Sequence, residues 1–340
     1  MEEDSLLIAR GLDEFPPGES GLALGTFDGV HLGHRQVIAS AIAVSREQGT
    51  RSVAVTFEPH PLEVLRPSAE PVLLTTIEER LALLSGLGLG AALVIPFDDA
   101  FSRTSAQVWM DEILSKRLGA RSVCVGSSYT FGHQREGTAR RLVEWGRERA
   151  VAVTLVPAVL IDGEPVSSSR IRGALREGLV DEVARLLGRD YSLRGRVEAG
   201  AGRGRTLGFP TANLAVDSSR KILPREGVYA TIVEVGGGRY GGATNIGRRP
   251  TFGGTSRTVE THLLDFSAQL VGASVVLHFV RRIREERAFP GPDALVRQIR
   301  EDVAQVRELL ASARPGYNTV VQETDNRRDA TGAQAPRRTA

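Results

Sequence analysis

Cysteine, lysine and long apolar runs are nearly absent from this sequence. Cys124 is its single cysteine, so no internal disulfide can form, which fits a reducing compartment. The apolar runs stay far below the roughly 20 residues that a membrane-spanning helix needs. The chain opens with Glu2, Glu3 and Asp4, whereas a signal peptide opens with positive charge. The composition therefore predicts a cytoplasmic protein without a membrane partner.

Lysine occurs only at Lys116 and Lys221, so almost all of the positive charge is arginine. The 43 basic residues are interspersed with 41 acidic ones, and the net charge is only +2. Binding to a phosphate backbone needs a continuous basic stripe, and the pattern shows none. We expect no specific nucleic-acid partner, and the pattern carries no signature of a particular oligomeric state. With 340 residues, the length suggests about two domains.

The first half of the chain alternates apolar runs with stretches of helical periodicity. The expected strands are residues 22–27, 52–57, 91–96, 122–125 and 151–156. The expected helices between them are residues 34–48, 77–87, 106–118 and 138–149. Continuous apolar strands that alternate with helices predict an α/β domain whose parallel sheet is covered on both faces. In such sheets, ligands bind beyond the carboxyl ends of the strands.

The second half of the chain is richer in glycine and in short β-type runs. Its expected strands are residues 193–198, 228–235, 240–245, 258–266 and 274–280, followed by one long helix over 292–313. This order predicts a compact antiparallel barrel or sandwich closed by the helix. The expected domains are therefore residues 1–187 and 188–313, and the polar tail over 314–340 is expected to be disordered.

A glycine-rich turn with two histidines follows the first expected strand of the α/β domain. Gly29 and Gly33 allow a tight turn, and the helix start that follows suits phosphate. His31 and His34 offer donors that stabilise charge developing on phosphorus, so direct attack on an α-phosphate is favoured. A lone histidine here would be a simple cap, but two around a glycine favour a functional site. The candidate ATP-binding residues of this turn are Gly25, Phe27, Asp28, Gly29 and Gly33.

The pattern G-x-F-D-G-x-H-x-G-H resembles the adenylyltransferase domain of bifunctional riboflavin kinase/FAD synthetases. Further similar segments are residues 56–61, 126–132 and 166–172. The resemblance implies a Rossmann-like nucleotidyltransferase domain that joins ATP and FMN into FAD and releases pyrophosphate. It also implies that Ser168 and Ser169 hold ATP, and that Arg172 acts with His31 and His34 by stabilising the departing pyrophosphate. Read without the resemblance, the serines are an ordinary helix cap.

One position departs from the family pattern in the segment over 126–132. Ser128 stands where the family usually carries Asp or Asn. This departure motivates an alternative hypothesis, a riboflavin kinase whose adenylyltransferase domain is weakened or inactive. The aromatic residues near the motifs are candidates for contact with the flavin ring. The candidate flavin-binding residues are Ser128, Tyr129, Phe131 and Phe252.

Glycine and arginine alternate over residues 200–205, ahead of the run L-G-F-P-T-A-N. Such a loop offers amide groups and cations to a polyphosphate, although a flexible turn is the simpler interpretation of the loop alone. Thr211 and Asn213 are two residues apart, so on an extended segment they face the same side and offer oxygen ligands for Mg²⁺. The other candidate ATP-binding residues of this loop are Gly202, Arg205, Gly208 and Pro210.

The run G-R-x-L-G-F-P-T-A-N resembles the riboflavin kinase signature, as do residues 227–230, 245–252 and 260–266. The resemblance implies a riboflavin kinase-like barrel in which Thr211 and Asn213 coordinate Mg-ATP. It also implies that Glu260 is the base near the 5′-hydroxyl of riboflavin. A carboxylate suits that role because a primary alcohol is barely ionised at pH 7. From the residues alone, a solvated strand residue or an ion-pair partner is the favoured interpretation of Glu260.

The resemblance covers residues 20 to 312 and predicts one enzyme with two activities. It phosphorylates riboflavin to FMN and adenylylates FMN to FAD, with ATP as the donor and Mg²⁺ as the cofactor. The expected partners are therefore the small molecules riboflavin, FMN and ATP. A third hypothesis, a non-enzymatic regulator that responds to flavin or RNA, predicts that catalytic groups are missing. The regulator hypothesis is disfavoured because His31, His34, Thr211, Asn213 and Glu260 are all present.

Overall fold

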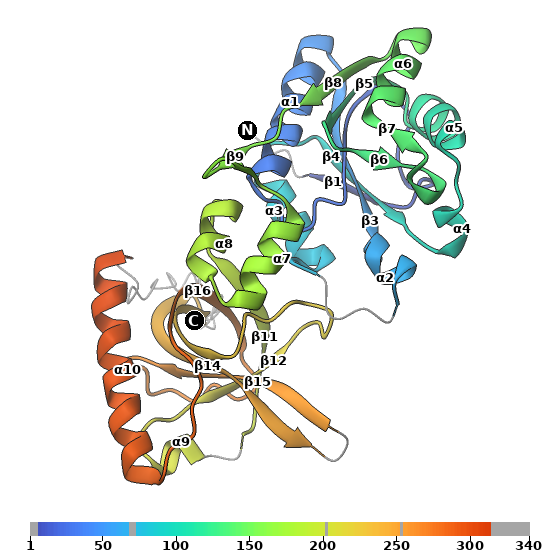
Figure 1. The fold of residues 1–340 in the computed structure, drawn as a ribbon. Helices are drawn as coiled ribbons and strands as arrows, with labels where there is room; N and C mark the ends of the chain where they lie inside the picture. The colour runs from blue at the N-terminus through green and yellow to red at the C-terminus, as the bar shows by residue number, and fades with distance from the viewer. Residues whose placement is uncertain (1–5, 68–72, 201–202, 252–253, 314–340) are drawn as a thin grey trace, which may run out of the picture.

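The computed structural model describes residues 6–67, 73–200, 203–251 and 254–313. They form a sheet-based N-terminal part and a barrel-based C-terminal part, with two short helices packed between them (Figure 1). The long C-terminal helix lies along the outside of the barrel. None of the helices in the described ranges combines the length and the apolar character needed to cross a bilayer.

A six-stranded parallel sheet forms the N-terminal part, in the order β1-β4-β3-β2-β5-β8. Its strands are β1 (Leu7–Arg10), β2 (Ser20–Leu24), β3 (Arg51–Glu58), β4 (Ala91–Pro96), β5 (Ala120–Gly126) and β8 (Ala152–Val156). The parallel sheet predicted from the apolar runs is confirmed. Strand β1 was not predicted, because it is short, lies at the sheet edge beside β4, and buries only Ala9.

Helices cover both faces of this sheet. They are α1 (Leu32–Gln48), α2 (Pro61–Leu65), α3 (Ile77–Ser85), α4 (Asp99–Ser102), α5 (Ala106–Val108), the π-helix η1 (Trp109–Arg117), the 3-10 helix η2 (His133–Arg135) and α6 (Ala139–Arg149). Alternation along β2 sends Leu22 and Leu24 into one cluster with Trp109, and Ala23 into the other with Ile38. The single helix expected over 106–118 is instead a short α-helix continued by η1.

The C-terminal part is a closed antiparallel barrel in the order β11-β12-β15-β14-β13-β16, so the sandwich alternative is excluded. Its strands are β11 (Tyr191–Glu198), β12 (Ala212–Val216), β13 (Gly227–Val235), β14 (Gly238–Thr251), β15 (Gly254–Leu263) and β16 (Ser274–Arg284). The short helix α9 (Arg203–Thr206) precedes β12, and α10 (Pro292–Ala313) matches the expected closing helix. Val306 and Leu310 of α10 pack on Ile232 and Leu264 of the barrel's outer surface.

Helices α7 (Ser168–Glu177) and α8 (Val180–Leu187) join the two parts. Short antiparallel pairs precede them, formed by β6 (Thr130–Phe131) with β7 (Gly137–Thr138) and by β9 (Leu160–Ile161) with β10 (Glu164–Pro165). Val183 and Leu186 of α8 belong to the same apolar cluster as Tyr191 and Phe279 of the barrel. The two helices therefore pack on the barrel even though they precede it in the sequence.

Replacing Leu186 by alanine tests this packing. Leu186 is fully buried in the cluster that α8 shares with the barrel, so its truncation leaves a cavity. We expect Leu186→Ala to lower the free energy of unfolding by about 2–5 kcal/mol, measured by urea denaturation. Leu179→Ala is the matched control, because Leu179 is 46% exposed at the start of the same helix. Equal urea midpoints for the two variants would contradict the shared core.

Candidate functional site

A cavity of about 590 Å³ opens at the carboxyl ends of the parallel strands. It lies where the strand order reverses, since β2 has β3 on one side and β5 on the other. The turn after β2, the start of α2, the segment after β5 and the start of α7 all contribute to its wall. The candidate residues that line it are Gly25, Phe27, His31, Gly33, His34, Ser128, Tyr129, Phe131 and Ser168.

His31 and His34 form a stacked pair at the start of α1. Their ring centroids are 3.6 Å apart, and Nδ1 of His31 accepts a hydrogen bond of 3.2 Å from the backbone N–H of His34. A neutral His31 ring therefore carries its proton on Nε2. Gly33 makes room for the stack, because a Cβ at this position would lie 3.2 Å from Cε1 of His31.

Both imidazoles are neutral at pH 7. Burial lowers the pKa of His31 to about 4, against an attractive contribution from Asp28. Burial also lowers the pKa of His34 well below its ordinary value, and the neighbouring His31 adds to the effect. Each neutral ring carries one N–H group that can donate a hydrogen bond.

Asp28 has a different position from the one expected of a phosphate-binding residue. Its carboxylate is fully buried and accepts hydrogen bonds from the backbone N–H groups of Leu74 and Thr75, at 2.9–3.1 Å. It also forms an ion pair with Arg172. This carboxylate is occupied by buried partners and Asp28 does not line the cavity, so its assignment to ATP binding stays a prediction. The sequence shows that Asp28 lies in the turn but not where its side chain points.

The other predicted residues of α7 divide between the cavity and its surroundings. Ser167 caps the helix through a 3.2 Å bond from the N–H of Arg170, as the simple cap interpretation holds. Ser168 lines the cavity and donates to the backbone oxygen of Asp28 at 3.0 Å. Ser169 is exposed outside the cavity wall, and Arg172 lies behind the wall, paired with Asp28.

A group of aromatic side chains that sequence reasoning missed also lines the cavity. Phe57 lies 5.7 Å from Phe97, 5.9 Å from Phe101 and 6.0 Å from Trp109, measured between ring centroids. One signal was available, because Phe57 is near the end of β3 and Phe97 directly follows β4, at the edge where ligands bind. The cavity wall thus carries a group of aromatic rings in addition to the two imidazoles.

His60 caps α2 at the edge of the same cavity. Its Nδ1 accepts from the N–H of Leu62 at 3.1 Å, and Glu63 accepts from the N–H of His60 at 3.1 Å. This capping box fixes the local geometry at the start of α2. His133 is exposed, and Cys124 is fully buried in β5.

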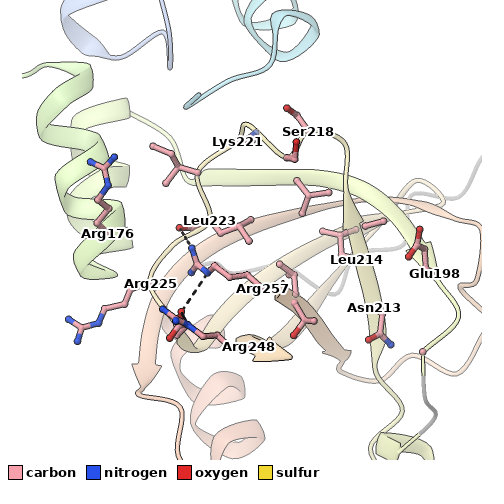
Figure 2. Close-up of a pocket in the computed structure, with 18 of the residues that line it drawn as sticks. Arg176, Glu198, Asn213, Leu214, Ser218, Lys221, Leu223, Arg225, Arg248 and Arg257 are labelled. Atoms are coloured by element: carbon pink, nitrogen blue, oxygen red, sulfur yellow. Dashed lines mark hydrogen bonds and ion pairs between the residues drawn. The ribbon is translucent and has the colours of Figure 1, made fainter. Parts of the chain in front are cut away.

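Two further cavities, of about 890 and 510 Å³, lie on the barrel, and Asn213 lines both. Figure 2 shows the larger one, with Glu198 and Asn213 on one side and cationic side chains on the other. The basic residues that line it are Arg176, Lys221, Arg225, Arg248 and Arg257. Glu226 pairs with Arg248 at 2.6 Å. Thr211 and Pro210 line the smaller cavity.

Glu260 and Asn213 lie side by side on the outer surface of the barrel. They are direct partners across β12 and β15, and Asn245 is the partner of Glu260 across β14. Directly opposed residues share a face, so the three form one row. Val259 and Thr261 are buried and point inward, which places Glu260 outward. The predicted base therefore lies beside a predicted magnesium ligand.

The glycine-rich loop packs closely on the predicted magnesium ligands. A Cβ at Gly200 would lie 1.9 Å from Nδ2 of Asn213, and one at Gly204 would lie 3.1 Å from Oγ1 of Thr211. Gly208 has a φ of +85°, in the turn between α9 and β12. Gly202, Phe252 and the side chain of Arg205 lie outside the described residues.

Comparisons with known proteins match both parts of the chain. A family model of FAD synthetase matches residues 16–170, and one of riboflavin kinase matches residues 187–310. The chain is 35% identical over 300 residues to the bifunctional riboflavin kinase/FMN adenylyltransferase of Bacillus subtilis, covering 87% of this chain and 94% of the relative. It is 33% identical over 307 residues to the protein of the same name in Escherichia coli, covering 90% and 97%.

A solved structure is similar over almost the same length. The crystal structure described as a macrolide-efflux protein from Streptococcus pneumoniae superposes with a TM-score of 0.80 at 30% identity. The match covers 89% of this chain and 99% of that one. The two-part fold is therefore shared with an experimentally determined structure.

Replacing His60 by asparagine tests the effect of its burial. Burial lowers the pKa of His60 from 6.5 to about 4, so between these values the unfolded chain binds a proton that the folded chain does not. Stability therefore falls as the pH drops through 6.5 and levels off below about 4. His60→Asn keeps the cap, and should gain up to roughly 3 kcal/mol relative to the wild type between pH 7 and pH 4.

Urea denaturation across this pH range measures the effect. The matched control is His133→Asn, because the exposed ring of His133 is solvated in both states. A pH dependence of His60→Asn that parallels the wild type would show that His60 takes up its proton in the folded protein as well.

Proposed function

This chain belongs to the family of bifunctional riboflavin kinase/FMN adenylyltransferases, and we propose that its cavities divide the two reactions between them. The cavity at the strand ends takes ATP and FMN for adenylyl transfer, and the cavities beside Asn213 take ATP and riboflavin for phosphorylation. The observation that carries this assignment is the convergence of the stacked histidines, Ser168 and an aromatic wall on one cavity.

In adenylyl transfer, a phosphate oxygen of FMN attacks the α-phosphorus of ATP. A new P–O bond forms, the bond between the α-phosphorus and the bridging oxygen breaks, and pyrophosphate leaves. The N–H groups of His31 and His34 and the start of α1 lie where negative charge grows in this step. The aromatic rings on the cavity wall, among them Phe57 and Trp109, provide faces on which a planar ring can stack.

Arg172 supports this site through Asp28. The guanidinium group is paired with the buried carboxylate, which holds both the turn after β2 and residues 74–75. A direct contact between Arg172 and pyrophosphate would require it to leave that pair. Ser128 replaces the family's carboxylate or amide with a hydroxyl on the cavity wall, which retains one donor and one acceptor.

In riboflavin phosphorylation, the 5′-hydroxyl attacks the γ-phosphorus in line with the departing ADP. Glu260 is placed on the barrel surface to orient this hydroxyl and to accept its proton, and the basic residues of the larger cavity attract the phosphates. Asn213 lines both barrel cavities, so we place the transferred phosphate near its side chain.

The donor set beside Glu260 fits Mg²⁺. Thr211 and Asn213 offer neutral oxygen atoms, and the close approach of Gly200 and Gly204 leaves the loop's backbone against them. Within the described residues, no group of three or more His, Cys, Asp or Glu side chains forms a metal cage. This is the pattern expected of a magnesium ion that arrives with ATP and takes few protein ligands. Bound there, Mg²⁺ would neutralise phosphate charge.

Replacing Glu260 by glutamine tests the kinase assignment. The amide keeps the shape but cannot accept the proton, so we expect FMN formation from riboflavin to fall about 100-fold or more. Conversion of supplied FMN to FAD should change less than twofold, which also shows that the chain is folded. Glu234→Gln is the matched control, because Glu234 lies near the C-terminal end of β13. Undiminished kinase activity of Glu260→Gln would exclude Glu260 as the base.

Replacing His31 or His34 by alanine tests the other assignment. Each change removes a hydrogen-bond donor from the strand-end cavity, so we expect FAD formation from FMN and ATP to fall roughly 100-fold. Riboflavin phosphorylation by the same chain should persist, and His133→Ala is the matched control. If the wild-type protein with ATP, Mg²⁺ and FMN makes no FAD, the chain is a riboflavin kinase alone.

A further inference from the structure

The turn that presents the two histidines has a backbone that needs outside support. Phe27 and Val30 have φ values of +49° and +41°, in the left-handed region that side chains rarely adopt. Val30 is β-branched, which makes this conformation especially unfavourable, and it directly precedes His31. Such conformations persist only where the surrounding structure holds them. The contacts of this turn therefore determine where the imidazoles lie.

Arg189 provides support from beyond the adenylyltransferase part of the chain. Its Nη2 donates to the backbone oxygen of Gly29 at 2.8 Å, and its Nη1 lies 3.5 Å from the backbone oxygen of Val30. Arg189 follows α8, outside the FAD synthetase match over 16–170 and inside the riboflavin kinase match over 187–310. A residue of the kinase part thus holds the carbonyl groups next to His31.

A second support of the turn is also anchored on the barrel. Thr75 accepts a 3.0 Å hydrogen bond from the N–H of Gly29 through its hydroxyl. Leu73, two residues before Thr75, forms a parallel bridge with Lys221 of the loop between β12 and β13. Its backbone N–H donates to Arg220 and its carbonyl accepts from Ile222, at 3.0 Å each. A loop of the barrel therefore fixes the segment that fixes the turn.

The Lys221–Glu79 ion pair stabilises this contact between the segment around Leu73 and the barrel loop. The ammonium group of Lys221 is almost fully buried, binds both carboxylate oxygens of Glu79, and lies 5.4 Å from the ring centre of Tyr191. Glu79 also accepts from the N–H of Thr76 at 2.9 Å, which ties the pair to the start of α3. Figure 2 shows Lys221 at the edge of the kinase cavity that faces the N-terminal part.

We propose that Arg189 is a positioning residue for adenylyl transfer, and that the Lys221–Glu79 pair supports the same turn from the barrel. The kinase domain then completes the adenylyltransferase site without touching its substrates. This inference rests on the proposed function of the strand-end cavity. Its physical basis is that a displacement of the carbonyls of Gly29 and Val30 moves His31, and small displacements of catalytic groups cost large factors in rate.

Arg189→Gln in the full-length chain tests the proposal, with FAD formation and riboflavin phosphorylation measured on the same preparation. We expect the kcat for FAD formation to fall about 10-fold or more, with KM values for ATP and FMN changed less than threefold. Riboflavin phosphorylation should change less than twofold. Arg189→Lys retains the charge and one donor, so its kcat should lie between those of the wild type and Arg189→Gln.

Arg185→Gln is the matched control, because Arg185 lies in α8 and forms an ion pair with Asp162, at 2.8 Å, on the exposed surface. FAD formation by Arg189→Gln at the rate of this control overturns the proposal. A parallel fall of both activities together with the melting temperature also overturns it, because the role is then merely structural. Failure of the wild-type protein to form FAD contradicts the proposed function itself. This outcome is distinguishable from a failure of the Arg189 proposal, in which the wild-type protein forms FAD and the variant matches its control.

Glu79→Gln tests the second support. The amide oxygen still caps α3, but the charge facing Lys221 is lost, so we expect FAD formation to fall about threefold or more. The adjacent Glu78→Gln is the matched control, because Glu78 is exposed on the same turn of helix. Equal kcat values for FAD formation in the two variants would remove the Lys221–Glu79 pair from the proposal.

Discussion

The buried ion pair between Asp28 and Arg172 is the interaction on which the N-terminal site depends. A carboxylate without solvent exposure is tolerated only when it is paired and hydrogen-bonded, and Asp28 meets both conditions. Its partners come from two distant segments, residues 74–75 and α7, and the pair joins both to the turn after β2 that carries Asp28. Removing either charge would leave the other buried alone, so the pair holds these segments in one arrangement and with them the stacked histidines.

The two reactions place opposite demands on the groups around their substrates, and the two candidate sites differ in the same sense. Adenylyl transfer starts from a phosphate that is already ionised, so it needs donors, and the histidines of the strand-end cavity are neutral N–H donors. Phosphorylation of riboflavin starts from a neutral alcohol, so it needs an acceptor, and Glu260 lies in the row with Asn213. FMN, the product of the second site, is the substrate of the first.

The sequence predicted what depends on local pattern, and missed what depends on distant segments. Apolar strands and helical periodicity placed the parallel sheet, and the family motifs identified the segments that meet in the cavity. The edge strand β1 was missed because it buries little, and the direction of the Asp28 side chain is set by residues far along the chain. The aromatic wall was missed because Phe57, Phe97 and Trp109 lie in separate segments of the sequence that only the fold brings together.

Contacts in the folded molecule cross the domain boundary expected between residues 187 and 188. Helix α7 serves both sides, since Ser168 at its start lines the strand-end cavity and Arg176 near its end lines a barrel cavity. Leu186 of α8 is buried in the cluster that includes Phe279 of the barrel, so a cut at this point would expose apolar surface on both fragments. Arg189, just beyond the cut, holds the turn before His31. Two family modules can therefore be adjacent in sequence while the contacts that hold the turn before His31 extend into the second of them.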